Sequence, residues 1–135
     1  MQIFQKTYRY IFANVLHTID DIKIYREDDR INMSHKYSQY GVYCNPSTIE
    51  RGQMINMAYE GILAQNGADR VFSCVGYGPN TKWTGVSLVE MKKIGPNKFE
   101  SQFTVGNRGN LNVAFKDSAE HWDNNNGQNY VFESK

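Results

Sequence analysis

The side chains best suited to ligand recognition are concentrated in residues 116–130. Trp122 stands on a polar stretch of this segment, where no core pattern requires a large ring. Four asparagines follow it closely: Asn124, Asn125, Asn126 and Asn129. A flat indole packs on the C–H face of a sugar ring, and amide groups donate to and accept from its hydroxyls. The segment therefore predicts one half of a site for a neutral, hydroxyl-rich ligand.

A second aromatic loop covers residues 76–83. Glycines flank Tyr77 and Pro79 follows them, so we expect a turn that exposes rings. If this loop and the Asn-rich loop emerge on the same side of the domain, Trp83, Trp122 and Tyr77 form an angled platform. The alternative for Trp83 is a core tryptophan of an immunoglobulin-like strand, and its spacing does not decide between the two positions.

Catalytic chemistry is not indicated by the sequence. The three histidines, His17, His35 and His121, lie in unrelated segments, and no serine-nucleophile, zinc-protease or phosphate-loop motif occurs. The carboxylates from residue 50 onward are Glu50, Glu60, Asp69, Glu90, Glu100, Asp117, Glu120, Asp123 and Glu133. Glycoside cleavage requires two of them to meet as acid and base, yet most fall at turns or at outward strand positions. We therefore expect no enzyme.

A calcium site is the main alternative for the polar segment. Its candidate oxygen ligands are Asp117, Glu120, Asp123, Asn124 and Asn126. Their spacing differs from that of an EF-hand loop, and a solvated, turn-rich loop explains the same residues. The two cysteines, Cys44 and Cys74, lack the close spacing of a zinc or redox motif. No metal and no cofactor are expected.

Period-two alternation dominates the chain after residue 40. Gly, Pro, Asn or Asp interrupts it every ten or so residues, which is typical of an antiparallel sandwich. The predicted strands are 40–44, 53–59, 70–75, 86–92, 98–105, 110–116 and 129–132. Alternation puts Phe99, Phe103 and Val105 on one face of their strand, and likewise Leu111, Val113 and Phe115 on one face of theirs, which predicts these faces to be core. The prediction is a mainly β domain over 40–135, an immunoglobulin-like sandwich of about seven strands.

The first 25 residues have a different pattern. Apolar side chains recur at spacings of three and four from Phe4 to Ile22, which predicts an amphipathic helix. Residues 26–39 are polar and read as a linker, so residues 1–39 form an N-terminal segment of helix and linker. The helix either packs on its own domain or docks a second copy as a homodimer.

The overall charge excludes some partners. The chain of 135 residues has 15 basic and 14 acidic side chains, scattered along it, so it lacks the field that nucleic acid requires. No apolar run reaches the roughly 18 residues of a membrane span, and no signal-peptide layout is present. We expect a cytoplasmic protein without a membrane partner, or a secreted one if these residues belong to a longer chain.

Residues 122–130 read W-D-N-N-N-G-Q-N-Y, and this sequence resembles the W-D-N-N-x-G-x-N-Y signature of starch-binding carbohydrate modules. These are families 25 and 53, with the signature shared by family 21. The resemblance continues through residues 111–117, which match L-x-x-x-F-x-D, and residues 61–69, which match G-x-L-A-x-x-G-A-D. It extends to Tyr77-Gly78 with Trp83, and in all it covers residues 51–132.

The resemblance implies a β-sandwich that binds α-1,4-linked glucans, such as starch, glycogen or maltooligosaccharides, without cleaving them. Trp83 and Trp122 correspond to the stacking platform of such modules. The implied polar contacts are Lys82, Asn124, Asn125 and Asn126. Asp123 and Asn129 are expected to hold the loop itself, because Asx side chains readily cap turns.

One position departs from the family pattern. Many relatives carry a His-Tyr pair before the first loop, where this chain has Cys74 and Val75, and a thiol does not replace a sugar-stacking ring. Residues 1–50 fall outside the resemblance. The second hypothesis for the whole chain is therefore a targeting or scaffold protein, in which the N-terminal helix recruits an enzyme or a second copy.

Overall fold

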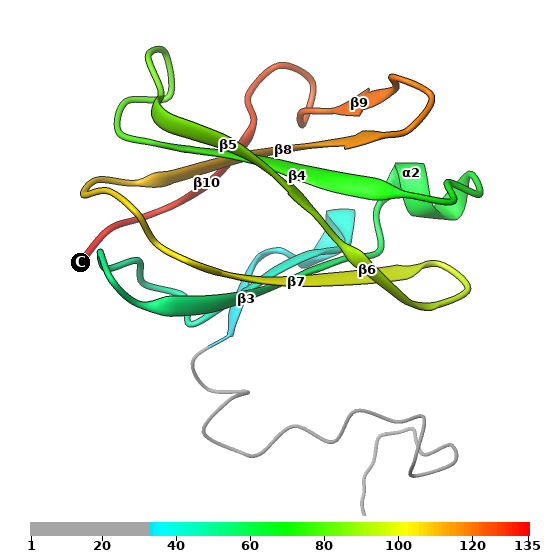
Figure 1. Ribbon diagram of the computed structural model, residues 1–135, viewed down its shortest axis with the longest axis horizontal. Coiled ribbons are helices and arrows are strands. Elements are labelled where there is room, and N and C mark those ends of the chain that lie inside the picture. The colour runs from blue at the N-terminus through cyan, green and yellow to red at the C-terminus, as the bar shows by residue number, and fades with distance from the viewer. Residues whose placement is uncertain (1–32) are drawn as a thin grey trace, which may run out of the picture. The chain divides into compact units, whose positions relative to one another are not determined.

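The computed structural model describes residues 33–135, which form a mainly β unit with two antiparallel sheets (Figure 1). The expected N-terminal helix and most of the expected linker lie outside the described residues. Within residues 33–135, helix is restricted to two short pieces, the 3-10 turn η1 (Ser38–Tyr40) and α2 (Ile62–Gln65). Neither helix of residues 33–135 has the length and apolar character needed to cross a lipid bilayer.

The first sheet has the strand order β1-β2-β3-β7-β6. Its strands are β1 (Ser34–Tyr37), β2 (Val42–Asn45), β3 (Met54–Tyr59), β7 (Lys98–Thr104) and β6 (Lys92–Gly95). β1 pairs with β2 from inside the stretch predicted as a linker, so the first sheet begins before residue 40. β1 is an edge strand, with His35 and Lys36 exposed.

The second sheet has the order β10-β8-β4-β5, and a short strand β9 also pairs with β8. Its strands are β4 (Val71–Tyr77), β5 (Thr84–Glu90), β8 (Leu111–Asp117), β9 (Trp122–Asp123) and β10 (Tyr130–Phe132). Figure 1 shows the chain running from β5 into β6 and so passing from one sheet to the other. The buried Met91 lies at this crossing.

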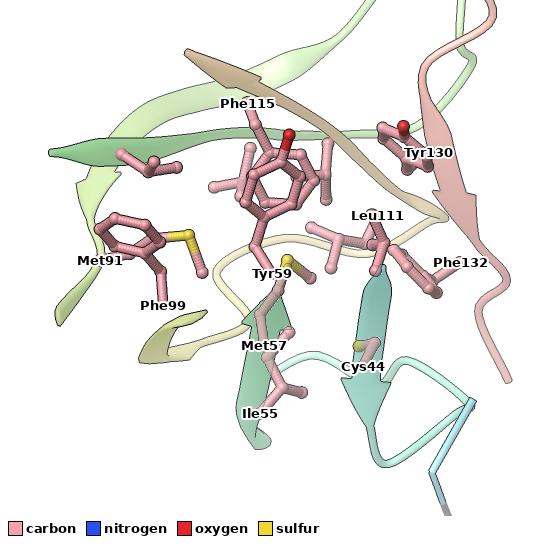
Figure 2. Close-up of a cluster of buried hydrophobic side chains, with 14 of the residues drawn as sticks. Cys44, Ile55, Met57, Tyr59, Met91, Phe99, Leu111, Phe115, Tyr130 and Phe132 are labelled. Carbon is pink, nitrogen blue, oxygen red and sulfur yellow. The ribbon is translucent and has the colours of Figure 1, made fainter. Parts of the chain in front are cut away.

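The core lies between the sheets (Figure 2). Tyr59 of β3 stacks on Phe115 of β8, with ring centroids 4.2 Å apart and an interplanar angle of 26°. Leu111 and Val113 are fully buried beside them, as alternation predicts. Burial of each such side chain contributes about 1.5–3 kcal/mol, so the facing rows of β3 and β8 hold the two sheets together.

All seven predicted strands are present at nearly the predicted bounds. Three further strands, β1, β6 and β9, were not expected from periodicity. These strands have two to four residues each and are mostly exposed, so no buried residues repeat along them at a spacing of two.

Candidate functional site

The outward-facing side of the second sheet carries the two tryptophans. Residues directly opposite each other in an antiparallel pair share a face. Lys116 lies opposite both Trp122 and Phe72, and Cys74 lies opposite both Ala114 and Leu88. Their neighbours along the strands point into the core. We call this surface the outer face: Phe72, Cys74 and Gly76 of β4, Asn112, Ala114 and Lys116 of β8, Leu88 of β5 and Trp122 of β9.

Trp122 is the most accessible ring of this surface. Its side chain is 51% exposed although it is a large hydrophobic residue. The ammonium of Lys116 lies 5.6 Å from the ring centroid, in the range of a cation–π contact. Lys116 in turn pairs with Glu120 at 3.2 Å. The indole is therefore held in place on one side and open to solvent on the other.

Trp83 lies on the same face, over Gly76. A Cβ added to Gly76 would approach Cε3 of Trp83 to 2.7 Å, so the glycine leaves the space that the ring occupies. The indole Nε1 donates to the carbonyl oxygen of Asn80 at 2.9 Å, with the Asn80 side-chain oxygen at 3.2 Å. Trp83 is half-buried and is not a member of the core cluster. Of its two expected positions, the structure places it at the surface.

The two predicted loops are tied to each other through Asn80. Its Nδ2 donates to the carbonyl oxygen of Gln128 at 2.9 Å, and its Oδ1 accepts from Nδ2 of Asn129 at 2.9 Å. Below them, Nδ2 of the fully buried Asn112 donates to the carbonyl oxygen of Gly78 at 3.0 Å. The loops therefore emerge on the same side of the sheet, which is the condition for a common platform.

Most asparagines of the Asn-rich loop stabilise the backbone of the loop itself. Asn125, Asn126 and Asn129 have φ values of 56°, 56° and 59°, a left-handed conformation that asparagine tolerates better than most residues. Oδ1 of Asn124 accepts from the amide of Gly127 at 3.0 Å, and Nδ2 of Asn125 donates to the carbonyl oxygen of Asn129 at 3.0 Å. The loop shape thus depends on Asn124 and Asn125 as well as on Asn129. Asn126 is exposed.

Asp123 anchors the loop to the core. It follows Trp122 in β9 and points the opposite way, where its carboxylate accepts hydrogen bonds from the hydroxyls of Tyr59 at 2.6 Å and Tyr130 at 2.8 Å. Burial and these bonds to the carboxylate raise the pKa of both tyrosines. Both hydroxyls therefore remain donors, and Asp123 connects the Asn-rich loop with both sheets.

Tyr77 does not belong to the expected platform, because its side chain is buried in the core. The turn expected around it begins later, because β4 continues to Tyr77 itself. Alternation then directs the side chain inward, where it is 4% exposed and its hydroxyl accepts from the amide of Gly106 at 3.0 Å. The ring is part of the core and is not available for stacking. Lys82, by contrast, is exposed in the turn that precedes Trp83.

Three of the candidate calcium ligands, Asp117, Glu120 and Asp123, have separate partners. Asp117 caps the turn between β8 and β9, accepting from the amides of Ala119 at 3.0 Å and His121 at 2.8 Å. Burial alone raises the pKa of Asp117, but these bonds and the His121 ring outweigh it, so its pKa lies below the usual value. Within residues 33–135 no group of three His, Cys, Asp or Glu side chains could hold a metal ion.

The two cysteines differ in environment. Cys44 is buried in the core, and burial raises the pKa of its thiol to about 12. Cys74 lies on the outer face and is partly exposed. Burial raises the pKa of its thiol too, and the charge of Lys116 opposes part of that effect. Cys74 is therefore on the surface that carries both tryptophans.

Asn80, Gly76 and Lys116 are site residues that sequence patterns do not single out. Asn80 links the two loops, Gly76 makes room for Trp83, and Lys116 supports Trp122. The available signals are a glycine within an alternating run and a lysine at an outward strand position.

Searches of protein-family models, curated proteins and solved structures find no match to this chain.

Proposed function

We propose that this chain is a non-catalytic binding module for α-1,4-linked glucans, built as an immunoglobulin-like sandwich similar to starch-binding families 25 and 53. The observation that supports it most is the placement of Trp83 and the 51% exposed Trp122 on one outer face. The two rings flank a strip of smaller side chains, which includes Cys74 and Ala114. Such a surface offers an aromatic ring for stacking at each end.

The dimensions of the outer face suit several sugar units. Trp122 lies in the row of Phe72, and Trp83 lies over Gly76, four residues further along β4. At roughly 3.4 Å per residue the rows are about 14 Å apart along the strand. An oligosaccharide longer than a disaccharide is therefore needed to reach both rings.

The affinity of the outer face for a single chain is expected to be low. The surface is open, so each ring contributes roughly 1 kcal/mol beyond its buried area, consistent with a dissociation constant of about 10⁻⁵ to 10⁻³ M. The thiol of Cys74 adds no stacking ring. Repeated sites along a polymer raise the apparent affinity, so glycogen is expected to bind more tightly than a short oligosaccharide.

Titration with maltoheptaose and with glycogen tests the proposal. Tryptophan fluorescence and amide chemical shifts are expected to change saturably, with the shifts centred on residues 80–83, 114–116 and 122–129. Cellulose-derived oligosaccharides of equal length serve as the control and are expected to bind more weakly. Spectra that stay unchanged at millimolar maltoheptaose rule the function out, and cleavage products from amylose contradict the non-catalytic part.

Gly76→Ala is expected to displace Trp83 and weaken maltoheptaose binding several-fold. The added Cβ meets not only the ring but also Cβ of Trp83 at 2.9 Å, so rotation of the ring alone does not relieve the contact. Overpacking of this kind costs about 1–3 kcal/mol of stability. Gly95→Ala is the matched control, because its new Cβ has Lys98 Cβ as its nearest neighbour, at 3.7 Å. If Gly76→Ala and Gly95→Ala bind maltoheptaose with equal affinity, Trp83 is not part of the binding site.

A further inference from the structure

A pocket of about 290 Å³ lies on the other side of the Asn-rich loop from the outer face. Its walls come from three segments that are far apart in sequence: η1, α2 and residues 123–130. Figure 1 shows α2 and β9 at the same end of the unit. None of the outer-face residues lines this pocket. Trp122 and Asp123 are neighbours in β9 that point to opposite sides, so the two surfaces are separate.

The apolar wall of the pocket is exposed without an evident structural reason. Tyr40 is 46% exposed and Ile62 is 57% exposed, and both rank among the large hydrophobic side chains that the described residues leave in solvent. The Tyr40 ring touches only the edge of the core, at 6.5 Å and 59° to the ring of Tyr130. An exposed ring with an aliphatic side chain in the same pocket provides a surface for an apolar ligand face.

Most of the polar groups in the lining are neutral. Gln39, Gln65 and Asn126 contribute amides that both donate and accept. The one ionisable carboxylate in the lining is that of Asp123, and both of its oxygens already accept from tyrosine hydroxyls. With no lysine or arginine in the lining, the pocket offers nothing to neutralise an anionic ligand. It is suited to a ligand with an apolar face and a rim of hydroxyls.

The pocket walls are held in place before any ligand binds. The hydroxyl of Tyr59 donates to Asp123 and accepts from the amide of Leu63 in α2 at 3.2 Å, which fixes α2 against β9. Gln65 Nε2 donates to the carbonyl oxygen of Glu60 at 3.0 Å. η1 ends at Gly41, whose carbonyl oxygen accepts from the amide of Glu60 at 2.7 Å. Such preorganisation reduces the entropy lost on binding.

We propose that this pocket is a second saccharide-binding site, which takes a terminal glucosyl or maltosyl unit of the same neutral α-glucans. This inference rests on the proposed function. Tyr40 is the stacking ring, and Gln39, Gln65 and Asn126 contact the hydroxyls. Its volume is at the lower end of the roughly 300–1,000 Å³ of small-molecule pockets, which suits a chain end rather than the middle of a polymer. The Asn-rich loop forms a wall between the two sites.

Amide chemical-shift mapping of the full chain with maltotriose tests the second site. Two separate groups of shifting resonances are expected, one on the outer face and one around Gln39, Tyr40, Ile62 and Gln65. Tyr40→Ala is expected to weaken binding at the pocket at least tenfold and leave the outer face unchanged, and Trp122→Ala is expected to do the reverse. Gln39→Ala is a milder second variant that leaves the contact between Tyr40 and Tyr130 in place. Tyr43→Ala, which removes a half-buried ring of β2, is the control.

The outcomes separate the two proposals. Shifts confined to the outer face, unaffected by Tyr40→Ala and Gln39→Ala, overturn the second site and leave the proposed function standing. Shifts confined to the pocket, lost in Tyr40→Ala, support the second site and overturn the platform. The absence of shifts at saturating maltotriose and maltoheptaose overturns both.

Discussion

Trp122→Ala is expected to weaken maltoheptaose binding by tenfold or more at the outer face while the fold remains intact. The ring is 51% exposed, so its removal costs few core contacts. Loss of the cation–π contact with Lys116 lowers stability by only about 0.5–1 kcal/mol at an exposed position. The loss of stacking area on the ligand is larger, and about 1.4 kcal/mol of binding free energy corresponds to a factor of ten.

Isothermal titration with maltoheptaose, together with urea unfolding, measures the two effects. Trp122→Phe is expected to fall between the wild type and the alanine variant, because it keeps a smaller ring. Met54→Ala is the matched control: Met54 is 56% exposed, and it belongs to β3 of the first sheet. Wild-type affinity in Trp122→Ala would show that the most accessible indole of the outer face is not part of the binding site.

Sequence patterns predict the sheets well because most strands have one buried face. In β3, the fully buried Ile55, Met57 and Tyr59 alternate with less buried residues, and this repeat is visible without any structure. The exposed position of Trp122 is also predictable, because it lies on a polar segment. By contrast, β9 has only two residues, so its pairing with β8 cannot be predicted from a sequence pattern. The pairing depends on the turn that Asp117 caps, which reverses the chain between β8 and β9.

Tyr77 shows why a local pattern misassigns a site residue. Glycines on both sides of a ring indicate a turn, but Gly76 is inside β4, where its missing side chain leaves room for Trp83. The contact that explains this glycine joins residues seven positions apart and depends on the turn between them. Once Gly76 is part of the strand, alternation places Tyr77 in the core.

The asparagines show a different limit. Their number in residues 124–129 indicates hydrogen-bonding capacity, but sequence does not separate amides used by the backbone from amides left for a ligand. Three of them adopt positive φ, and the side chains of Asn124 and Asn125 bind the loop backbone. The same composition therefore serves both loop geometry and recognition. The pocket beside Tyr40 is beyond prediction from sequence, because its walls come from segments that only the fold brings together.

Asp123→Ala is expected to destabilise the protein by about 3 kcal/mol and to weaken binding at both proposed sites. It leaves the hydroxyls of Tyr59 and Tyr130 without their acceptor, and each unsatisfied buried group costs about 1–3 kcal/mol. It also frees β9 and α2 from their common anchor, so the Trp122 platform and the wall of the pocket lose their fixed positions together.

Urea unfolding of Asp123→Ala, Asp123→Asn and the exposed control Asp69→Ala measures the effect. Asp123→Asn keeps one acceptor oxygen, so its loss of unfolding free energy is expected to lie between the losses of Asp123→Ala and Asp69→Ala. Tyr59→Phe and Tyr130→Phe remove one donor each, and a double-mutant cycle with Asp123→Ala is expected to show coupling, because the removed groups share these hydrogen bonds. If Asp123→Ala unfolds at the same urea concentration as Asp69→Ala, the carboxylate does not anchor the loop. The precise positions of both sites then depend on the asparagine backbone contacts and the Asn80 bridge alone.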